Sequence, residues 1–401
     1  MTMRPDSPAF LVLLAMLVAI GPLSTDLYLP SLPLLVEEFE ATTSEVQLTL
    51  SVFLFGFAVS QLIYGPLSDR FGRKPVLIAG LWIFVIASAT CAVATTIELL
   101  IALRLLQAIG ACSAGVVSRA IVRDLFERRQ AARILAYSGA LMGLAPAVAP
   151  LAGAYILVWI GWEANFFAVA LWGAALIVIV SVSLAESNAT PDPLALTPTR
   201  LFGNLHRLFK SRVYLGYALT NSAAFSGLFA FISGSSFVLI DVLDIPPVEF
   251  GYYFALGVFG YMLGAVVSGR LGGRVNVDRL MRTAATLMAL SGSTMAVMAL
   301  IGLENVWVMV VPMIFYMAGF GTIMPQSTAS ALIPFPDIAG LASSTLGFLQ
   351  MTVGSLVGVA VGIFHDGTPV PLALIIGGTG LGTLAAHIRV GRLVAQERPE
   401  S

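Results

Sequence analysis

The sequence predicts an all-α membrane protein with twelve transmembrane helices in two pseudo-symmetric six-helix bundles. Of its 401 residues, 58% are hydrophobic and only 11% are charged. A soluble chain holds roughly 45 to 50% apolar and about 25% charged residues, so this composition excludes an ordinary soluble enzyme. Two further observations set the number and direction of the helices: the recurrence of long apolar stretches, and the distribution of charge between the loops.

A helix that spans a bilayer needs about 20 mostly apolar residues. The first candidate stretch, residues 9–35, is not a secretory signal, because it continues well past the length of one and no A-x-A-like cleavage site follows it. Twelve stretches qualify: residues 9–35, 46–67, 75–96, 98–118, 134–160, 164–185, 213–240, 251–269, 280–302, 305–333, 338–364 and 370–388.

The charges separate between alternate loops. Every Lys and Arg except Arg104 falls on one side of the predicted membrane, which we call the basic side. The loops of the opposite, acidic side carry acids such as Glu45, Glu163 and Glu304 but no Lys or Arg. The positive-inside rule therefore places both termini in the cytoplasm. The formal net charge of −1 argues against nucleic acid as a partner.

A polar, proline-containing run divides the chain into an N-terminal six-helix bundle (1–185), a cytoplasmic linker (186–212) and a C-terminal six-helix bundle (213–401). The halves share a degraded repeat, because residues 65–74 after the second stretch resemble residues 269–274 after the eighth. Equal span numbers and this repeat indicate a duplicated unit. Nothing in the sequence requires a dimer, and we expect a monomer.

The sequence offers no machinery for an enzyme or a cofactor. It has no phosphate-binding G-x-x-x-x-G-K-[ST] loop. Its three histidines (His206, His365 and His387) are isolated from one another and from clustered carboxylates or thiols, which indicates no metal site. Cys91 and Cys112 lie in apolar spans and suggest no disulfide. We expect no catalytic residues, no metal and no cofactor, with a proton gradient as the energy source.

Two charged residues lie inside predicted spans: Asp26 in the first and Arg104 in the fourth. An ionised group there costs several kcal/mol unless it is paired or hydrated. Each lies about 10 Å inward from the acidic side at 1.5 Å per residue, so the two could meet. The functional interpretation is a carboxyl group that exchanges protons beside Arg104; the structural alternative is a salt bridge that pins two helices.

Polar and aromatic side chains in the spans are candidates for contact with substrate. In the first half, Tyr28 follows Asp26, and Gln107 lies on the polar stripe of Arg104. Aromatic and amide groups suit an apolar, mostly uncharged molecule, although aromatic residues in such helices also face lipid or fill the core. The second half contributes Tyr217, Asn221, Phe225, Gln326 and Gln350.

Residues 65–74, after the second span, form a predicted conformational latch. Gly65 and Gly72 permit a tight turn, Asp69 can face a helix N-terminus, and Arg70 and Arg73 can pair with acids or lipid phosphates. We expect this latch to set the balance between inward- and outward-facing states.

Four segments of the first half resemble signature sequences of the major facilitator superfamily. Within it they are most similar to the bicyclomycin and chloramphenicol/florfenicol resistance branch of twelve-span drug:proton antiporters. Residues 22–30, 65–74, 103–110 and 119–124 carry the resemblance. It implies the superfamily fold, a role for Asp26 in proton and drug coupling, and a role for Arg104 in proton transfer. Of the four glycines in the antiporter signature of span 5, only Gly153 is present, together with Pro150, which follows Pro146; small residues there permit close helix contact.

The resemblance implies a proton-coupled exporter of small, moderately apolar compounds of the amphenicol, bicyclomycin or sulfonamide type. It would work by alternating access in the bacterial inner membrane. A facilitator or a proton symporter for a small metabolite remains open, since three alanines stand in the antiporter signature. A polytopic membrane enzyme is a remote alternative, as is a sensor or scaffold without transport.

Overall fold

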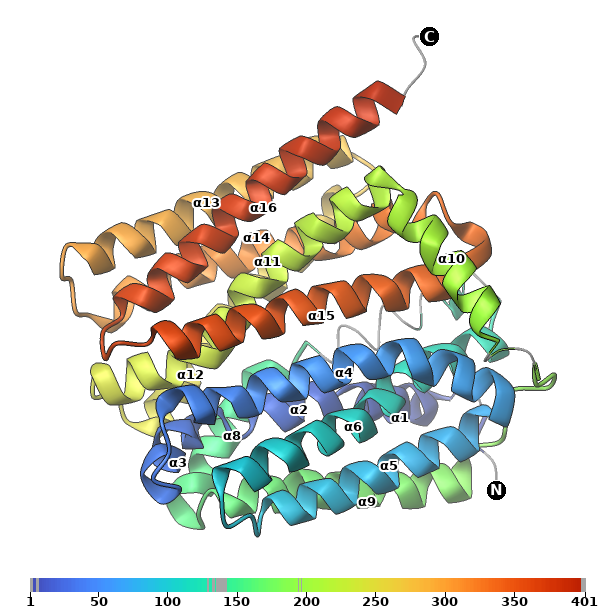
Figure 1. The fold of residues 1–401 in the computed structure, drawn as a ribbon, viewed down its shortest axis with the longest axis horizontal. Helices are drawn as coiled ribbons and strands as arrows, with labels where there is room; N and C mark the ends of the chain where they lie inside the picture. Colours follow the sequence, from blue (N-terminus) through green and yellow to red (C-terminus); the bar gives the residue numbers. More distant parts are fainter. Residues whose placement is uncertain are drawn as a thin grey trace. The chain divides into compact units, whose positions relative to one another are not determined.

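The computed structural model describes residues 3–4, 7–127, 130–131, 134, 143–193, 195 and 197–397. The regular elements of these residues are helices (Figure 1). Among these residues, ten helices are long and apolar enough to cross a membrane, and a bent pair at the N-terminus makes an eleventh span when the two helices are taken together. A shorter apolar helix, α8 (Ala145–Trp159), lies in the fifth predicted stretch, whose first residues fall largely outside the described ranges. The predicted all-α membrane fold is confirmed.

The chain divides into two compact units. Unit 1 comprises residues 1–41 and 52–201, and unit 2 comprises residues 42–51 and 202–401. The main division falls inside the predicted linker, whereas the first residues of the second span group with unit 2. The helices of unit 2 are α10 (Pro198–Lys210), α11 (Arg212–Ser236), α12 (Pro247–Leu271), α13 (Val277–Leu300), α14 (Val306–Leu332), α15 (Ala339–Phe364) and α16 (Val370–Glu397).

In unit 1 the second to sixth spans are formed by α4 (Thr43–Phe71), whose first residues group with unit 2, α5 (Arg73–Cys91), α6 (Ile97–Leu125), α8 and α9 (Glu163–Ser183). Helix α5 lies between α6 and α9 (Figure 1). Buried aliphatic and aromatic side chains from these helices and from the first span form one continuous core.

The first span is broken into short pieces, as its prolines predict. They are α1 (Pro8–Val18), α2 (Ile20–Asp26), the 3₁₀ turn Leu29–Ser31 and α3 (Leu32–Glu38), and the chain bends by 42° after α1. A proline lacks the N–H that a continuous helix needs, and Pro30 and Pro33 each stand in the first turn of a new piece. The break leaves Asp26 as the last residue of α2, beside non-helical backbone.

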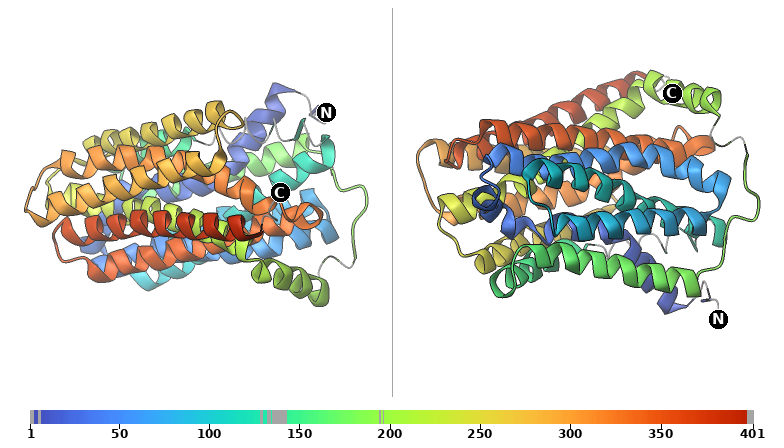
Figure 2. Two further views of the ribbon diagram at one scale, coloured as in Figure 1. Left: turned by 90° about the horizontal axis from the view of Figure 1, so that it is seen from above. Right: turned by 60° about the horizontal axis from the view of Figure 1, so that its bottom comes forward.

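Unit 2 is built around α11, which packs against α14, α15 and α16. Figure 2 shows α13 running alongside α14 and α16 in this unit. Glycines bring α12 and α14 into backbone contact, since a Cβ on Gly260 or Gly264 would overlap a carbonyl oxygen of α14. Such close packing is typical of helix association in membranes.

Candidate functional site

Arg104 lies at the centre of the polar region of unit 1. Its side chain projects from α6, and none of it is exposed. Three aromatic rings surround the guanidinium carbon: Phe53 with its centroid at 4.4 Å, Tyr28 at 4.7 Å and Phe166 at 5.8 Å. A cation over an aromatic face is stabilised by the ring quadrupole, most strongly away from water. These rings, here called the ring cage, partly offset the cost of burying the charge.

Hydrogen bonds fix one edge of the guanidinium. Arg104 Nη1 donates to the Ser24 carbonyl oxygen at 2.8 Å and to Gln107 Oε1. Gln107 Nε2 in turn donates to Ser88 Oγ at 2.8 Å, on α5. Arg104 Nε and Nη2 have no hydrogen-bond partner among the described residues. Because a buried charged donor without a partner is costly, this second edge is suited to receive an acceptor from a bound molecule.

Asp26 is also buried, with 2% of its surface exposed. Its Oδ1 lies 2.7 Å from Thr25 Oγ1, which lies 3.0 Å from the Pro22 carbonyl oxygen. When Asp26 is protonated, its hydroxyl group donates to Thr25 Oγ1, and Thr25 Oγ1 then donates to the Pro22 carbonyl oxygen. Each of these three oxygens then has a hydrogen-bond partner. An ionised Asp26 takes the single Thr25 proton for itself, so the Pro22 carbonyl loses that bond. The local geometry therefore accommodates the neutral acid well.

Asp26 and Arg104 do not form an ion pair in this structure. Among the described residues no ion pair joins them within 4 Å. Arg104 instead contacts the same segment through the Ser24 carbonyl and the ring of Tyr28. The break in the first span explains the difference, because it exposes a backbone carbonyl to the guanidinium.

Span 5 packs directly on that break. A Cβ on Gly153 would overlap the carbonyl oxygen of Leu27, the residue after Asp26. Pro150 and Gly153 are buried in α8, and Pro146 stands in its first turn. Asn165 on α9 donates to Ser31 Oγ at 3.2 Å and to the Gly153 carbonyl at 3.4 Å. The predicted packing motif thus lies against the backbone that carries Asp26.

The predicted latch is a network within unit 1. Arg73 is its centre, pairing with Asp69 at 2.5 Å and with Asp124 at 2.8 Å. Gly72 adopts φ +96°, a region that favours glycine. The Glu186 carboxylate caps α5 by accepting from the backbone N–H groups of Arg73 and Lys74 at 2.9 and 3.0 Å.

The remaining latch residues lie at the edge of this network. Arg70 stacks its guanidinium on Phe71, with 5.2 Å to the ring centroid. Gly65 lies inside α4, which continues to Phe71, so the predicted turn at this glycine is wrong, and a Cβ there would meet open space.

In unit 2 the predicted substrate residues fall into separate environments. Asn221 is buried on α11 and donates to Ser327 Oγ at 2.9 Å, while its Oδ1 has no partner among the described residues. Phe225 stacks on Phe229 and contacts Phe320. Gln326 binds Ser268 Oγ at 2.9 Å and so ties α14 to α12. Tyr217 packs beside the cluster around Tyr214, and Gln350 is buried on α15.

Several residues of these networks were not singled out from the sequence. Phe53 and Phe166 belong to the ring cage, but aromatic residues in apolar spans carry no distinguishing pattern. Ser88 and Glu186 act through partners that are remote in the chain. Asp124 lies in the branch-like segment 119–124, so its importance was indicated, although its pairing with Arg73 was not.

Apolar spanning helices in two units, a buried acid on a broken first span and a buried arginine on α6 are the features of a membrane transporter rather than an enzyme. The sequence profile of the Major Facilitator Superfamily matches residues 14–362, and the chain belongs to this family. It is therefore a multi-pass membrane protein.

Relatives are similar over nearly their whole length. The chain is 29% identical to the "Bicyclomycin resistance protein homolog" of Haemophilus influenzae, with 94% of each chain covered. It is 30% identical to "Multidrug resistance protein D" of Escherichia coli K12, with 88% of each covered. Among solved structures, a bacterial homolog of the human lysosomal transporter Spinster has a TM-score of 0.77 at 14% identity, covering 99% of both chains. That similarity concerns the fold alone.

Proposed function

We propose that this protein is a proton-coupled multidrug exporter that works by alternating access, taking small, moderately apolar compounds of the amphenicol, bicyclomycin or sulfonamide type. The names of the two relatives support drugs as the class of substrate. We also propose a monomer in a bacterial inner membrane with both termini in the cytoplasm, because Lys and Arg other than Arg104 gather on the basic side.

One observation carries the proton coupling: Asp26 is buried without an ion pair and held by Thr25, while Arg104 close by keeps one edge without a partner. Burial disfavours the ionised carboxyl group. Protonation of Asp26 and binding of a drug are therefore alternative ways to stabilise the buried polar groups of Asp26 and Arg104. A proton arriving from outside binds Asp26 and displaces the drug outward. Loss of that proton to the cytoplasm restores the drug-binding form.

The test is transport in proteoliposomes with an imposed pH gradient. Wild type, Asp26→Asn and Asp244→Asn are compared with amphenicols, bicyclomycin and sulfonamides. Asp244 undergoes the same chemical change in an acidic-side loop, where its positive φ of 52° also suits asparagine. We expect drug-evoked proton release in wild type and Asp244→Asn, and none in Asp26→Asn. Equal proton release from all three proteins would refute the assignment of Asp26.

A proton symporter or facilitator for a small metabolite is the second candidate, because alanines replace three of the four glycines of the span 5 signature. The same vesicles distinguish it. A symporter acidifies the vesicle lumen as it accumulates a labelled metabolite. A facilitator transports after the gradient is collapsed, and Asp26→Asn leaves that transport intact.

A further inference from the structure

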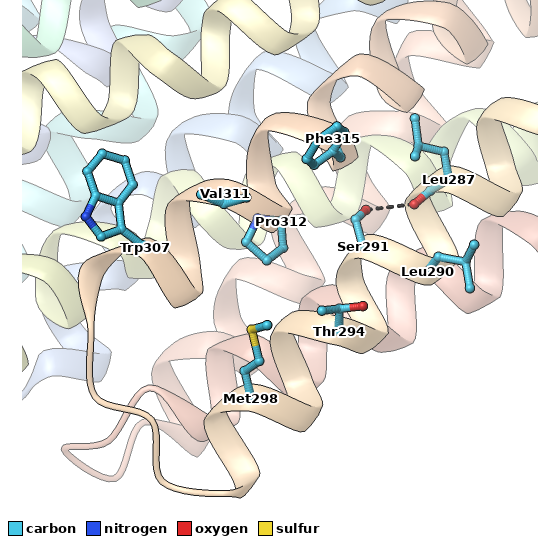
Figure 3. A pocket seen from close by; sticks show the side chains of 9 residues that line it. All are labelled: Leu287, Leu290, Ser291, Thr294, Met298, Trp307, Val311, Pro312 and Phe315. Atoms are coloured by element: carbon cyan, nitrogen blue, oxygen red, sulfur yellow. Dashed lines mark hydrogen bonds between the residues drawn. The ribbon is translucent and has the colours of Figure 1, made fainter.

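A groove lies on the surface of unit 2 between α13 and α14 (Figure 3). Its volume is about 380 Å³. Small side chains form its floor, where Pro312 faces Ser291 and Thr294, and larger apolar side chains form its walls. The walls include Leu287, Leu290, Met298, Trp307 and Phe315.

The lining offers few polar contacts. Ser291 Oγ donates to the backbone oxygen of Leu287 at 2.8 Å, so its hydroxyl proton is already used within α13. The exposed walls, among them Leu290 and Phe315, belong to helices that cross a membrane. A hydrocarbon chain fits such a surface, because it needs no hydrogen bonds and gains from burial of apolar area.

The length and position of the groove match one leaflet. From Leu287 to Met298 it extends about 16 Å along α13 at 1.5 Å per residue, and half of a hydrocarbon core of about 30 Å is about 15 Å. Its acidic-side end, here called the mouth, is lined by Met298 near the end of α13 and Trp307 near the start of α14. There Trp307 packs edge-on against Tyr253, with ring centroids 5.6 Å apart, and such aromatic pairs are typical of the membrane interface.

The charge at the mouth selects the headgroup. Residues 301–305 join the two helices, and Glu304 is the one charged residue among them. An exposed carboxylate attracts an ammonium group and repels an anionic headgroup. We propose that the α13–α14 groove holds an acyl chain of phosphatidylethanolamine from the acidic-side leaflet, with its amine beside Glu304. The orientation proposed above makes this the outer leaflet.

Fluorescence of Trp307 tests the proposal. The protein is placed in phosphatidylglycerol vesicles that contain a minor fraction of either brominated phosphatidylethanolamine or brominated phosphatidylglycerol. The quenching due to Trp307 is obtained by subtracting the fluorescence quenching of the Trp307→Phe counterpart from that of each protein. We expect about twofold stronger quenching by the brominated phosphatidylethanolamine, the size of preference that an exposed ion pair supports. Glu304→Gln should abolish the preference.

Thr294→Phe fills the groove, and Val297→Phe is the matched control, since Val297 is exposed on α13 outside the groove. Thr294→Phe should lower the quenching to that of randomly mixed lipid, whereas Val297→Phe should leave it unchanged. Equal quenching by both brominated lipids, or a Thr294→Phe protein that behaves like wild type, would overturn the proposal. The measurement uses neither drug nor pH gradient, so it succeeds or fails independently of the proposed transport.

Discussion

Replacement of Gly153 by alanine tests how closely span 5 supports the proposed proton site at Asp26. The added Cβ would overlap the Leu27 carbonyl oxygen and lie 2.6 Å from its carbon and 3.1 Å from its Cα. Ordinary carbon contacts are about 3.5 to 4.0 Å. All three obstructing atoms belong to the backbone, so no side chain can rotate away. The helix α8 must separate from the first span at the residue next to Asp26.

Two effects compete in this substitution. Alanine favours the helical state over glycine by about 1 kcal/mol. Overpacking costs about 1 to 3 kcal/mol or more. The cost here should be at the upper end of that range, because the obstructing atoms of Leu27 are all backbone atoms. We expect the overpacking to prevail and to lower the unfolding midpoint by about 5 °C, because 1 kcal/mol corresponds to about 2 to 4 °C for a unit of this size.

The assay is thermal unfolding of purified Gly153→Ala in detergent, together with drug-evoked proton release in proteoliposomes. Gly257→Ala is the matched control: it lies within α12, and its added Cβ would meet nothing within 4 Å. The control should keep or slightly raise the wild-type midpoint. A Gly153→Ala protein that equals wild type in midpoint and in transport would show that the contact with Leu27 is not required, and the reasoning would be wrong.

Three further substitutions follow from the structure. Arg104→Lys should reduce kcat/KM for transport by tenfold or more at unchanged expression, because an ammonium cannot fill the planar ring cage; wild-type transport would contradict this. Glu186→Gln should destabilise the protein by about 1 kcal/mol in thermal unfolding, since a neutral amide caps α5 less well, and an unchanged midpoint would refute the cap. Asp69→Asn should alter the inward–outward balance, measured by cysteine accessibility, while drug affinity stays unchanged; the reverse result would refute the latch.

The fold followed from the sequence because the bilayer leaves few solutions. Without water, every backbone polar group must bond within the segment, so a long apolar stretch implies a helix. Charge separation between the loops then favoured a count of twelve spans. Where the bilayer does not decide, prediction was weaker: the prolines of the first span indicated a bend, but the direction of the chain after Asp26 depends on packing against Gly153.

The latch shows the same limit at the level of single residues. Gly72 could be assigned to a turn because it stands in the polar segment that ends the second span. Its φ of +96° in the structure agrees with that assignment. The partners of Arg73 could not be assigned. Asp69 is four residues away, but Asp124 lies at the end of another helix and Glu186 at the start of the linker. Depth in the membrane limits which residues can meet, and tertiary packing selects among them.

The absence of an ion pair between Asp26 and Arg104 bears on how the proposed proton site works. A direct ion pair would hold Asp26 ionised and resist protonation, since an opposite charge favours the charged form. In this structure the ring cage and the Ser24 carbonyl stabilise the arginine without a carboxylate. Asp26 is then free to be neutral while Arg104 stays charged. A shift of the broken segment could later exchange the Ser24 carbonyl for the Asp26 carboxylate at the unpartnered edge of Arg104, which would couple loss of the proton to movement of the first span.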